Sequence, residues 1–263
     1  MPATIDEGLC IRQWDWSETS QTAAIFCRAL GLVRVLAKGS KRPKHPYSGG
    51  LEMLTRGRMG VIVRPSSELA LLTEWDLVQS FPALRASLGV HQAGLYIADL
   101  IQHVIHDHDP HTALYDATIE CLGVLRGPED VGLALLKFQW SALVETGYKP
   151  ELAADIRTGE ALGEAAAYGF SPALGGFHSD TARERSGGGE GGASTHSSGI
   201  WRVRRGTLEL LRGVDAAGLS GLTGGVDADA VERANRLLAS YLRHVLGAEP
   251  PTMAVVFGSR LSR

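Results

Sequence analysis

The sequence has no apolar run that approaches the roughly 20 residues a membrane-spanning helix needs, so no membrane partner is expected. Its N-terminus, MPATIDEGLC, lacks a basic stretch followed by an apolar one, and no signal peptide is predicted. The three cysteines, Cys10, Cys27 and Cys121, are few and far apart. Their spacing disfavours a disulfide framework and a Cys-x-x-Cys metal site, and it favours reduced thiols in the cytoplasm.

A Gly-x-x-x-x-Gly-Lys-Ser/Thr phosphate loop is also absent from the sequence, so a nucleotide-hydrolysing motor is not expected. The composition is that of a globular protein, with 44% hydrophobic and 21% charged residues. A chain of 263 residues is long enough for one large domain or for two of ordinary size.

Positive charge is concentrated in one segment, although the formal net charge of the chain is −3. Between Arg34 and Arg64 the sequence holds eight basic residues and one acidic residue, Glu52. Because Lys and Arg neutralise the backbone of a polyanion, the segment predicts contacts with phosphates, and a solvated loop is the alternative. The predicted residues are Arg34, Lys38, Lys41, Arg42 and Lys44, with Arg56, Arg58 and Arg64 as a second group.

Residues 7 to about 80 contain five short apolar runs, separated by Gly, Pro, Ser and basic residues. No long helical pattern lies between the runs, which disfavours a three-layer α/β fold and predicts a small closed barrel of five strands. Trp14, Trp16 and Trp75 fall in this region. Such tryptophans either fill the core of a barrel or stack on nucleic-acid bases.

The hydrophobic period changes to a helical one at Phe81-Pro82. Helices are predicted within residues 83–108, 111–127, 128–148 and 227–247. The expected fold is therefore α+β and multidomain, with a barrel over residues 1–81 and an all-α helical domain over residues 82–263. Residues 186–199 are rich in Gly and Ser and are expected to form a flexible loop, since they bury too little apolar area to offset ordering entropy.

The segment HVIHDHDPH, residues 103–111, holds four histidines and two aspartates. Such a cluster could bind a metal and activate water, so a metal-dependent hydrolase built on His103 to His111 is one alternative function. The spacing is unfavourable, because no two histidines stand four apart as in His-Glu-x-x-His. A second alternative is a protein adaptor without affinity for DNA.

The stretches DWSETS (residues 15–20) and GLVRVLAKG (31–39) are followed by a basic loop. The stretches GLYIADL (94–100), LLKF (135–138) and GYKP (147–150) come later in the chain. The first set is similar to the start, and the second to later helices, of the RecO family of bacterial recombination mediators, which the order of these motifs resembles. The resemblance covers most of the chain and implies an N-terminal OB-fold barrel followed by a helical domain.

This resemblance implies a function in DNA repair and recombination that needs no enzymatic chemistry and no cofactor. The implied activities are binding of single- and double-stranded DNA, annealing of complementary strands and help in loading RecA on SSB-coated DNA. The implied partners are RecR and the C-terminal tail of SSB, in the cytoplasm at the nucleoid. In the family the acidic tail of SSB docks on the helical domain, which indicates Leu95, Lys137 and Phe138 here; core positions are the alternative for Leu95 and Phe138.

The sequence departs from the family in one place. Many members carry a four-cysteine zinc module after the Gly-Tyr-x-Pro stretch, but here Asp155, Thr158, His178 and Thr181 occupy those positions. Structural zinc needs four nitrogen or sulfur ligands, and threonine is a poor one. The segment at about residues 150–185 is therefore expected to hold no metal and to be held by packing.

Overall fold

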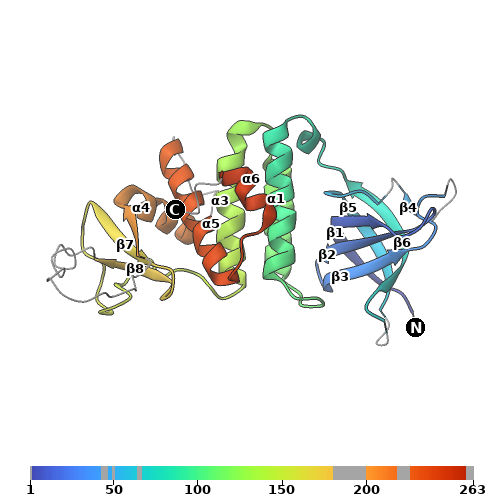
Figure 1. Ribbon diagram of the computed structural model, residues 1–263, viewed down its shortest axis with the longest axis horizontal. Coiled ribbons are helices and arrows are strands. Elements are labelled where there is room, and N and C mark those ends of the chain that lie inside the picture. Colours follow the sequence, from blue (N-terminus) through green and yellow to red (C-terminus); the bar gives the residue numbers. More distant parts are fainter. Residues whose placement is uncertain are drawn as a thin grey trace, which may run out of the picture.

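The fold is described from a computed structural model of the chain. It describes residues 2–42, 47–48, 51–63, 67–179, 200–217 and 226–258. Figure 1 shows a β-barrel at one end of the molecule, helices in the middle and a small sheet toward the other end. Among the helices in these ranges, none is both long enough and apolar enough to cross a bilayer.

The N-terminal sheet closes on itself as a five-stranded barrel. Its strands are β1 (Thr4–Asp15), β2 (Gln21–Cys27), β3 (Gly31–Ala37), β5 (Arg56–Ile62) and β6 (Ala70–Gln79). The order β3-β2-β1-β5-β6 is antiparallel, and a parallel pairing of β3 with β6 completes the ring. A two-residue strand, β4 (Tyr47–Ser48), also pairs with β6. The predicted five-stranded barrel is confirmed.

Alternation along β2 and β3 gives the barrel two apolar faces. Ile25 and Val33 point inward and pack in the barrel core, which also contains the fully buried Trp75. Phe26 and Leu32 point outward and belong to the core of the helical region. One outer face of the barrel is thus partly covered by the helices, and Trp75 fills the core.

The helical region contains the four helices that the sequence predicts and further elements that it does not. The predicted ones are α1 (Leu88–Val104), α2 (Thr112–Val124), α3 (Val131–Glu145) and α5 (Ala228–Leu246). The additional ones are α4 (Arg205–Ala217), α6 (Pro251–Phe257) and a sheet of β7 (Ala167–Ser171), β8 (Gly176–Ser179) and β9 (Trp201–Arg204). The α+β class is confirmed, but the second domain is not all-α, because strands of four or five residues are too short to show clear alternation.

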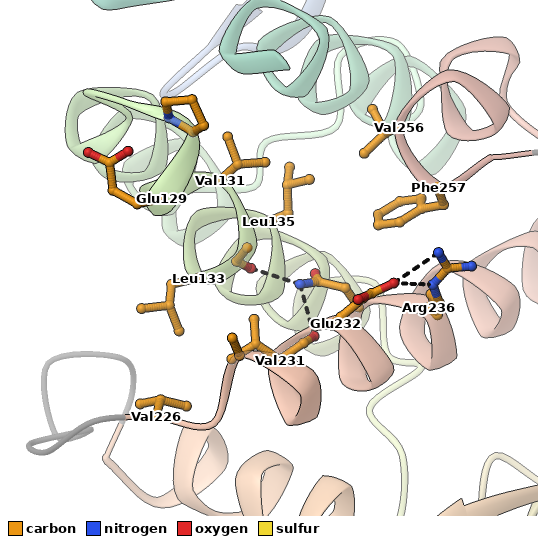
Figure 2. A pocket seen from close by; sticks show the side chains of 14 residues that line it. Glu129, Val131, Leu133, Leu135, Val226, Val231, Glu232, Arg236, Val256 and Phe257 are labelled. Carbon is orange, nitrogen blue, oxygen red and sulfur yellow. Dashed lines mark hydrogen bonds and ion pairs between the residues drawn. The ribbon is translucent and has the colours of Figure 1, made fainter.

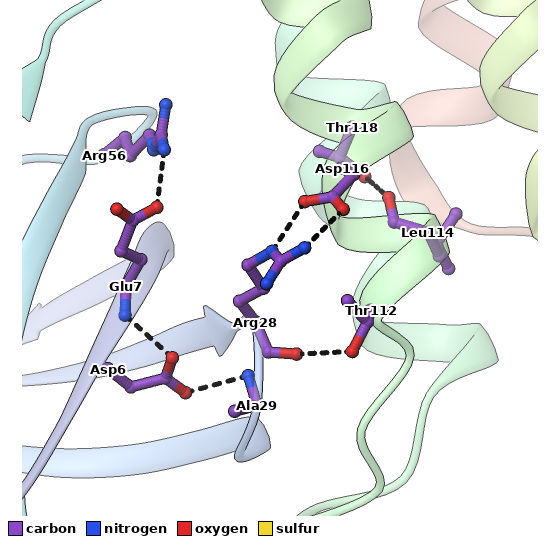
Figure 3. Close-up of polar contacts among 9 residues, drawn as sticks. All are labelled: Asp6, Glu7, Arg28, Ala29, Arg56, Thr112, Leu114, Asp116 and Thr118. Carbon is purple, nitrogen blue, oxygen red and sulfur yellow. Dashed lines mark hydrogen bonds and ion pairs between the residues drawn. The ribbon is translucent and has the colours of Figure 1, made fainter.

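Figure 3 shows the joint between the barrel and α2. The Arg28 guanidinium, after β2, donates two hydrogen bonds to Asp116, at 2.8 and 2.9 Å. These bonds lower the pKa of the Asp116 carboxyl. The Thr112 hydroxyl donates to the Arg28 carbonyl at 3.1 Å, and the rings of Phe26 and Tyr115 meet edge to face with centroids 5.5 Å apart. The joint therefore combines a bidentate ion pair with apolar packing.

Gly31 is required at the joint. Its φ is +72°, and a Cβ on it would lie 2.4 Å from the carbonyl oxygen of Asp109 in the loop between α1 and α2. We expect Gly31→Ala to lower the free energy of unfolding by about 2–4 kcal/mol, through left-handed strain and overlap with backbone atoms. Gly89→Ala in α1 is the control, because a Cβ on Gly89 would meet no neighbouring atom within 4 Å. The higher helix propensity of alanine should raise the free energy of unfolding by up to about 1 kcal/mol. Denaturant unfolding measures both, and equal stability of the two variants contradicts this role of Gly31.

Candidate nucleic-acid interface

The outer face of β1, β2 and β3 carries two rows of side chains at the edge of the part that the helices cover. Strand register places Arg12 and Arg34 on either side of Ala24, and it places Trp14 and Leu36 at the two ends of the next row. Directly opposed residues of antiparallel strands point to the same face. Two arginines and an aromatic ring therefore share one face of the barrel.

Arg12 and two of the tryptophans are exposed on this side. The Arg12 guanidinium lies 5.2 Å from the centroid of the Trp14 ring, a cation–π arrangement. Trp14 is 41% exposed, and Trp16, in the turn after β1, is 62% exposed. Both indole rings are accessible to a base. Arg12 could not be predicted from the sequence because it lies outside the basic segment, and only the strand register shows its neighbours.

The segment after β3 packs against the turn between β1 and β2. The Lys41 amide donates to the Thr19 carbonyl at 3.1 Å, and the Gly39 amide donates to the Ser20 hydroxyl at 3.1 Å. This packing brings exposed cations next to the turn that carries Trp16. We call the resulting set the barrel-end surface: Arg12, Trp14, Trp16, Arg34, Lys38, Lys41 and Arg42.

Carboxylates neutralise part of this surface. Lys41 pairs with Asp15 at 2.5 Å, and Arg34 pairs with Asp107 at 2.9 Å. Across the described part of the chain, Lys38 and Arg42 form no ion pair, and neither does Arg12. The three unpaired cations are the strongest candidates for phosphate contacts.

The second group of predicted basic residues does not join the barrel-end surface. Arg56 is half-buried near the joint and pairs with Glu7 at 2.5 Å. Arg58 is exposed, but strand register places it between Glu7 on β1 and Asp76 on β6. Two neighbouring carboxylates make Arg58 a poor anion site. Lys44 and Arg64 lie outside the described residues.

The histidine-rich segment is distributed around the end of α1 and the loop after it. The His103 ring lies 2.7 Å from the Asp99 carbonyl, and His111 lies 3.1 Å from the Asp109 carboxylate. In the described ranges, no three His, Cys, Asp or Glu side chains are grouped to hold a metal ion. The arrangement gives no support to a metal-dependent hydrolase.

The residues predicted for the SSB tail do not form a common opening. Phe138 is completely buried, so it belongs to the core of the helical region and offers no surface to a partner. Leu95 is partly buried and packs against the same core. Lys137 pairs with Glu120 of α2. For Phe138 the core alternative is therefore the correct one.

Figure 2 shows a cavity of about 450 Å³ in the helical region. It lies between the start of α3, α5 and the end of α6, with apolar walls that include Val131, Leu135 and Phe257. Arg236 lies on its rim and pairs with Glu232 at 2.9 Å. Sequence analysis missed this cavity because its walls come from three distant segments.

At the positions of the zinc module, Asp155 works as a hydrogen-bond acceptor. One carboxylate oxygen accepts from the amides of Arg157 at 3.0 Å and Thr158 at 3.4 Å, and the other accepts from Ser179 of β8 at 2.8 Å. Burial opposes the charge, but these donors outweigh it and lower the pKa of Asp155. His178 is buried and Thr181 lies outside the described residues. This donor set does not fit zinc, because both Asp155 oxygens already face N–H donors.

Aromatic packing holds the rest of this segment. Phe170 of β7 contacts Phe177, Trp201 and Tyr241, with ring centroids 5.0, 5.6 and 5.2 Å apart. Tyr241 comes from α5, so the cluster fixes the small sheet against the helices. Aromatic packing and the Asp155 hydrogen bonds therefore both stabilise this segment.

Two family models match the chain, in the order of its two regions. "Recombination protein O N terminal" matches residues 1–81, and "Recombination protein O C terminal" matches residues 92–254. A DNA repair protein RecO from Anaeromyxobacter dehalogenans is 30% identical over 248 residues, which is 91% of this chain and 90% of that protein. A DNA repair protein RecO from Rhodopirellula baltica is 35% identical over 142 residues, 54% of this chain and about half (53%) of that relative's length.

A closed barrel followed by a helical region, each matched by its own family model, defines a two-part protein of a family whose members are named for recombination and DNA repair. The chain belongs to the RecO family.

Proposed function

We propose that this protein is a DNA-binding recombination mediator in DNA repair that acts by binding alone, without bond-making chemistry. One observation carries the proposal: Arg12 and Arg34 share a row on the outer barrel face, next to two exposed tryptophans. Membership of the RecO family supports it. In this proposal residues 1–81 hold the DNA and residues 82–263 make the contacts with partner proteins.

The barrel-end surface fits both parts of a nucleic acid. Phosphates attract the cations and release counterions, and bases stack on Trp14 and Trp16 for about 1–3 kcal/mol each. OB-fold barrels commonly bind oligonucleotides on the face of strands 2 and 3 and at the loop between strands 1 and 2, which is where this surface lies. Neutralising the backbones of two strands at one surface would promote annealing of single strands and also allow binding of a duplex.

The proposed partners are RecR and the C-terminal tail of SSB, and the proposed outcome is help in loading RecA on SSB-coated DNA at the nucleoid. The cavity between α3, α5 and α6 would suit an apolar end of the SSB tail, and an acidic residue of the tail would displace Glu232 from Arg236 on the rim. An adaptor that lacks DNA affinity would bind these partners without binding DNA.

A salt titration tests DNA binding. Fluorescence anisotropy of a labelled single strand should give an affinity that falls steeply with NaCl, with a log–log slope on the order of −3 for four or five phosphate contacts at about −0.7 each. An affinity that does not change with salt, or no binding at low salt, contradicts the proposal. A strand-annealing assay with and without SSB then tests the mediator function.

A further inference from the structure

Arg34 belongs to the barrel-end surface and, at the same time, to the contact between barrel and helices. It shares its row with Arg12, yet its Nε donates to a carboxylate oxygen of Asp107 at 2.9 Å. The side chains of Arg34 and Asp107 are 53% and 44% exposed, so the pair is open to solvent. A phosphate that reaches this row meets an arginine that a carboxylate already occupies.

Asp107 is placed beside Arg34 by the helical region. It lies in the loop between α1 and α2, where the next amide, that of His108, donates to the Leu32 carbonyl of β3 at 2.9 Å. Gly31 allows the backbone of Asp109 to approach β3 closely. The loop is thus anchored on β3, and the carboxylate of Asp107 reaches Arg34 from outside the barrel.

We infer that Asp107 competes with DNA phosphate for Arg34, so that the helical region lowers the DNA affinity of the barrel. This inference rests on the proposed function and adds its regulation. Bound phosphate would release Asp107, while the Arg28–Asp116 pair continues to hold the joint. A partner that draws the α1–α2 loop away from β3 would strengthen DNA binding. Because such coupling is reciprocal, bound DNA would strengthen binding of that partner by the same factor.

Asp15, the other carboxylate that pairs with a cation of the barrel-end surface, differs from Asp107 in its place in the fold. Asp15 pairs with Lys41, but both residues belong to the barrel and its loops. Their pairing does not depend on the position of the helical region. Asp107 is therefore the carboxylate that links DNA affinity to the joint.

The test measures binding of a labelled single strand at about 50 mM and about 200 mM NaCl for the full chain and its variants. Asp107→Asn should tighten binding about 3- to 5-fold at the lower salt and less at the higher, in line with an exposed ion pair. Asp109→Asn removes the same charge from the same loop, and Asp116→Asn weakens the joint elsewhere; each should change affinity by less than about 1.5-fold. In an Arg34→Ala background, Asp107→Asn should have no effect.

Thermal unfolding of each variant shows whether it folds, and Asp107→Ser provides a second replacement if Asp107→Asn does not. An equal gain in Asp107→Asn and Asp109→Asn, or a gain that persists without Arg34, overturns the inference and leaves DNA binding intact. A wild-type chain that binds no strand overturns both the inference and the proposed function.

Discussion

Replacing Arg12, Lys38 and Arg42 together by alanine should weaken binding of a labelled single strand about 100-fold at about 50 mM salt. These are the cations of the barrel-end surface without a carboxylate partner in the described part of the chain. Each phosphate contact with a single strand has a log–log salt slope of about −0.7, which is close to tenfold in affinity between 1 M and 50 mM. Three exposed contacts, each partly made, therefore give a loss on the order of 100-fold, measured by anisotropy across a salt series.

A control variant removes three positive charges from parts of the chain outside the barrel-end surface. Arg58, Arg126 and Arg204 are exposed and lie on β5, between α2 and α3, and on β9. Their joint replacement by alanine should change affinity by less than about threefold, through the loss of net charge alone. The salt slope should fall by about 1.5 in the first variant and stay constant in the second. Similar losses in both variants would show that the chain has no localised DNA surface on the barrel.

The barrel could be predicted from sequence because its signals are local. Apolar runs of strand length end at Gly31, Gly39 and other breakers, and no helical period intervenes. Trp75 shows the limit of such reasoning: its neighbours in the sequence do not reveal that it packs on Gly57, where a Cβ would lie 2.4 Å from the indole. The sheet of β7, β8 and β9 was not predicted, since its strands have only four or five residues and β9 pairs with β7 from a later segment of the chain.

The proposed DNA surface could be predicted only in part, because a count of charges along the chain contains no strand register. The count located Lys38, Lys41 and Arg42 but also included Arg56, whose partner Glu7 is 49 residues away. It omitted Arg12, which lies in the same row as Arg34, with Ala24 of β2 between them. Net charge in a window predicts that an anion site exists, whereas pairing between strands decides which cations face it.

Asp155→Ala should clearly destabilise the segment that replaces the zinc module. The alanine leaves the amides of Arg157, Thr158 and Ser179 without their acceptor at a part-buried position. We expect the free energy of unfolding to fall by about 2–4 kcal/mol, as is usual when hydrogen bonds to a charged group are lost. Thr158→Ala is the control: its side chain is exposed and accepts a single 3.3 Å bond from the Glu160 amide, so the loss should be below about 0.5 kcal/mol.

Thermal unfolding at several pH values and with a chelator distinguishes stabilisation by the Asp155 carboxylate from stabilisation by a bound metal ion. The pKa of Asp155 is lowered in the folded chain, so its contribution is complete above the usual aspartate pKa of about 3.9 and is lost as pH falls through the lower folded value. The difference in melting temperature between wild type and Asp155→Ala should therefore be constant from pH 7 to about pH 5 and shrink below about pH 4. A chelator should leave the wild-type melting temperature unchanged. A drop on chelation, or a difference that does not depend on pH, would assign the stability of this segment to something other than the Asp155 carboxylate.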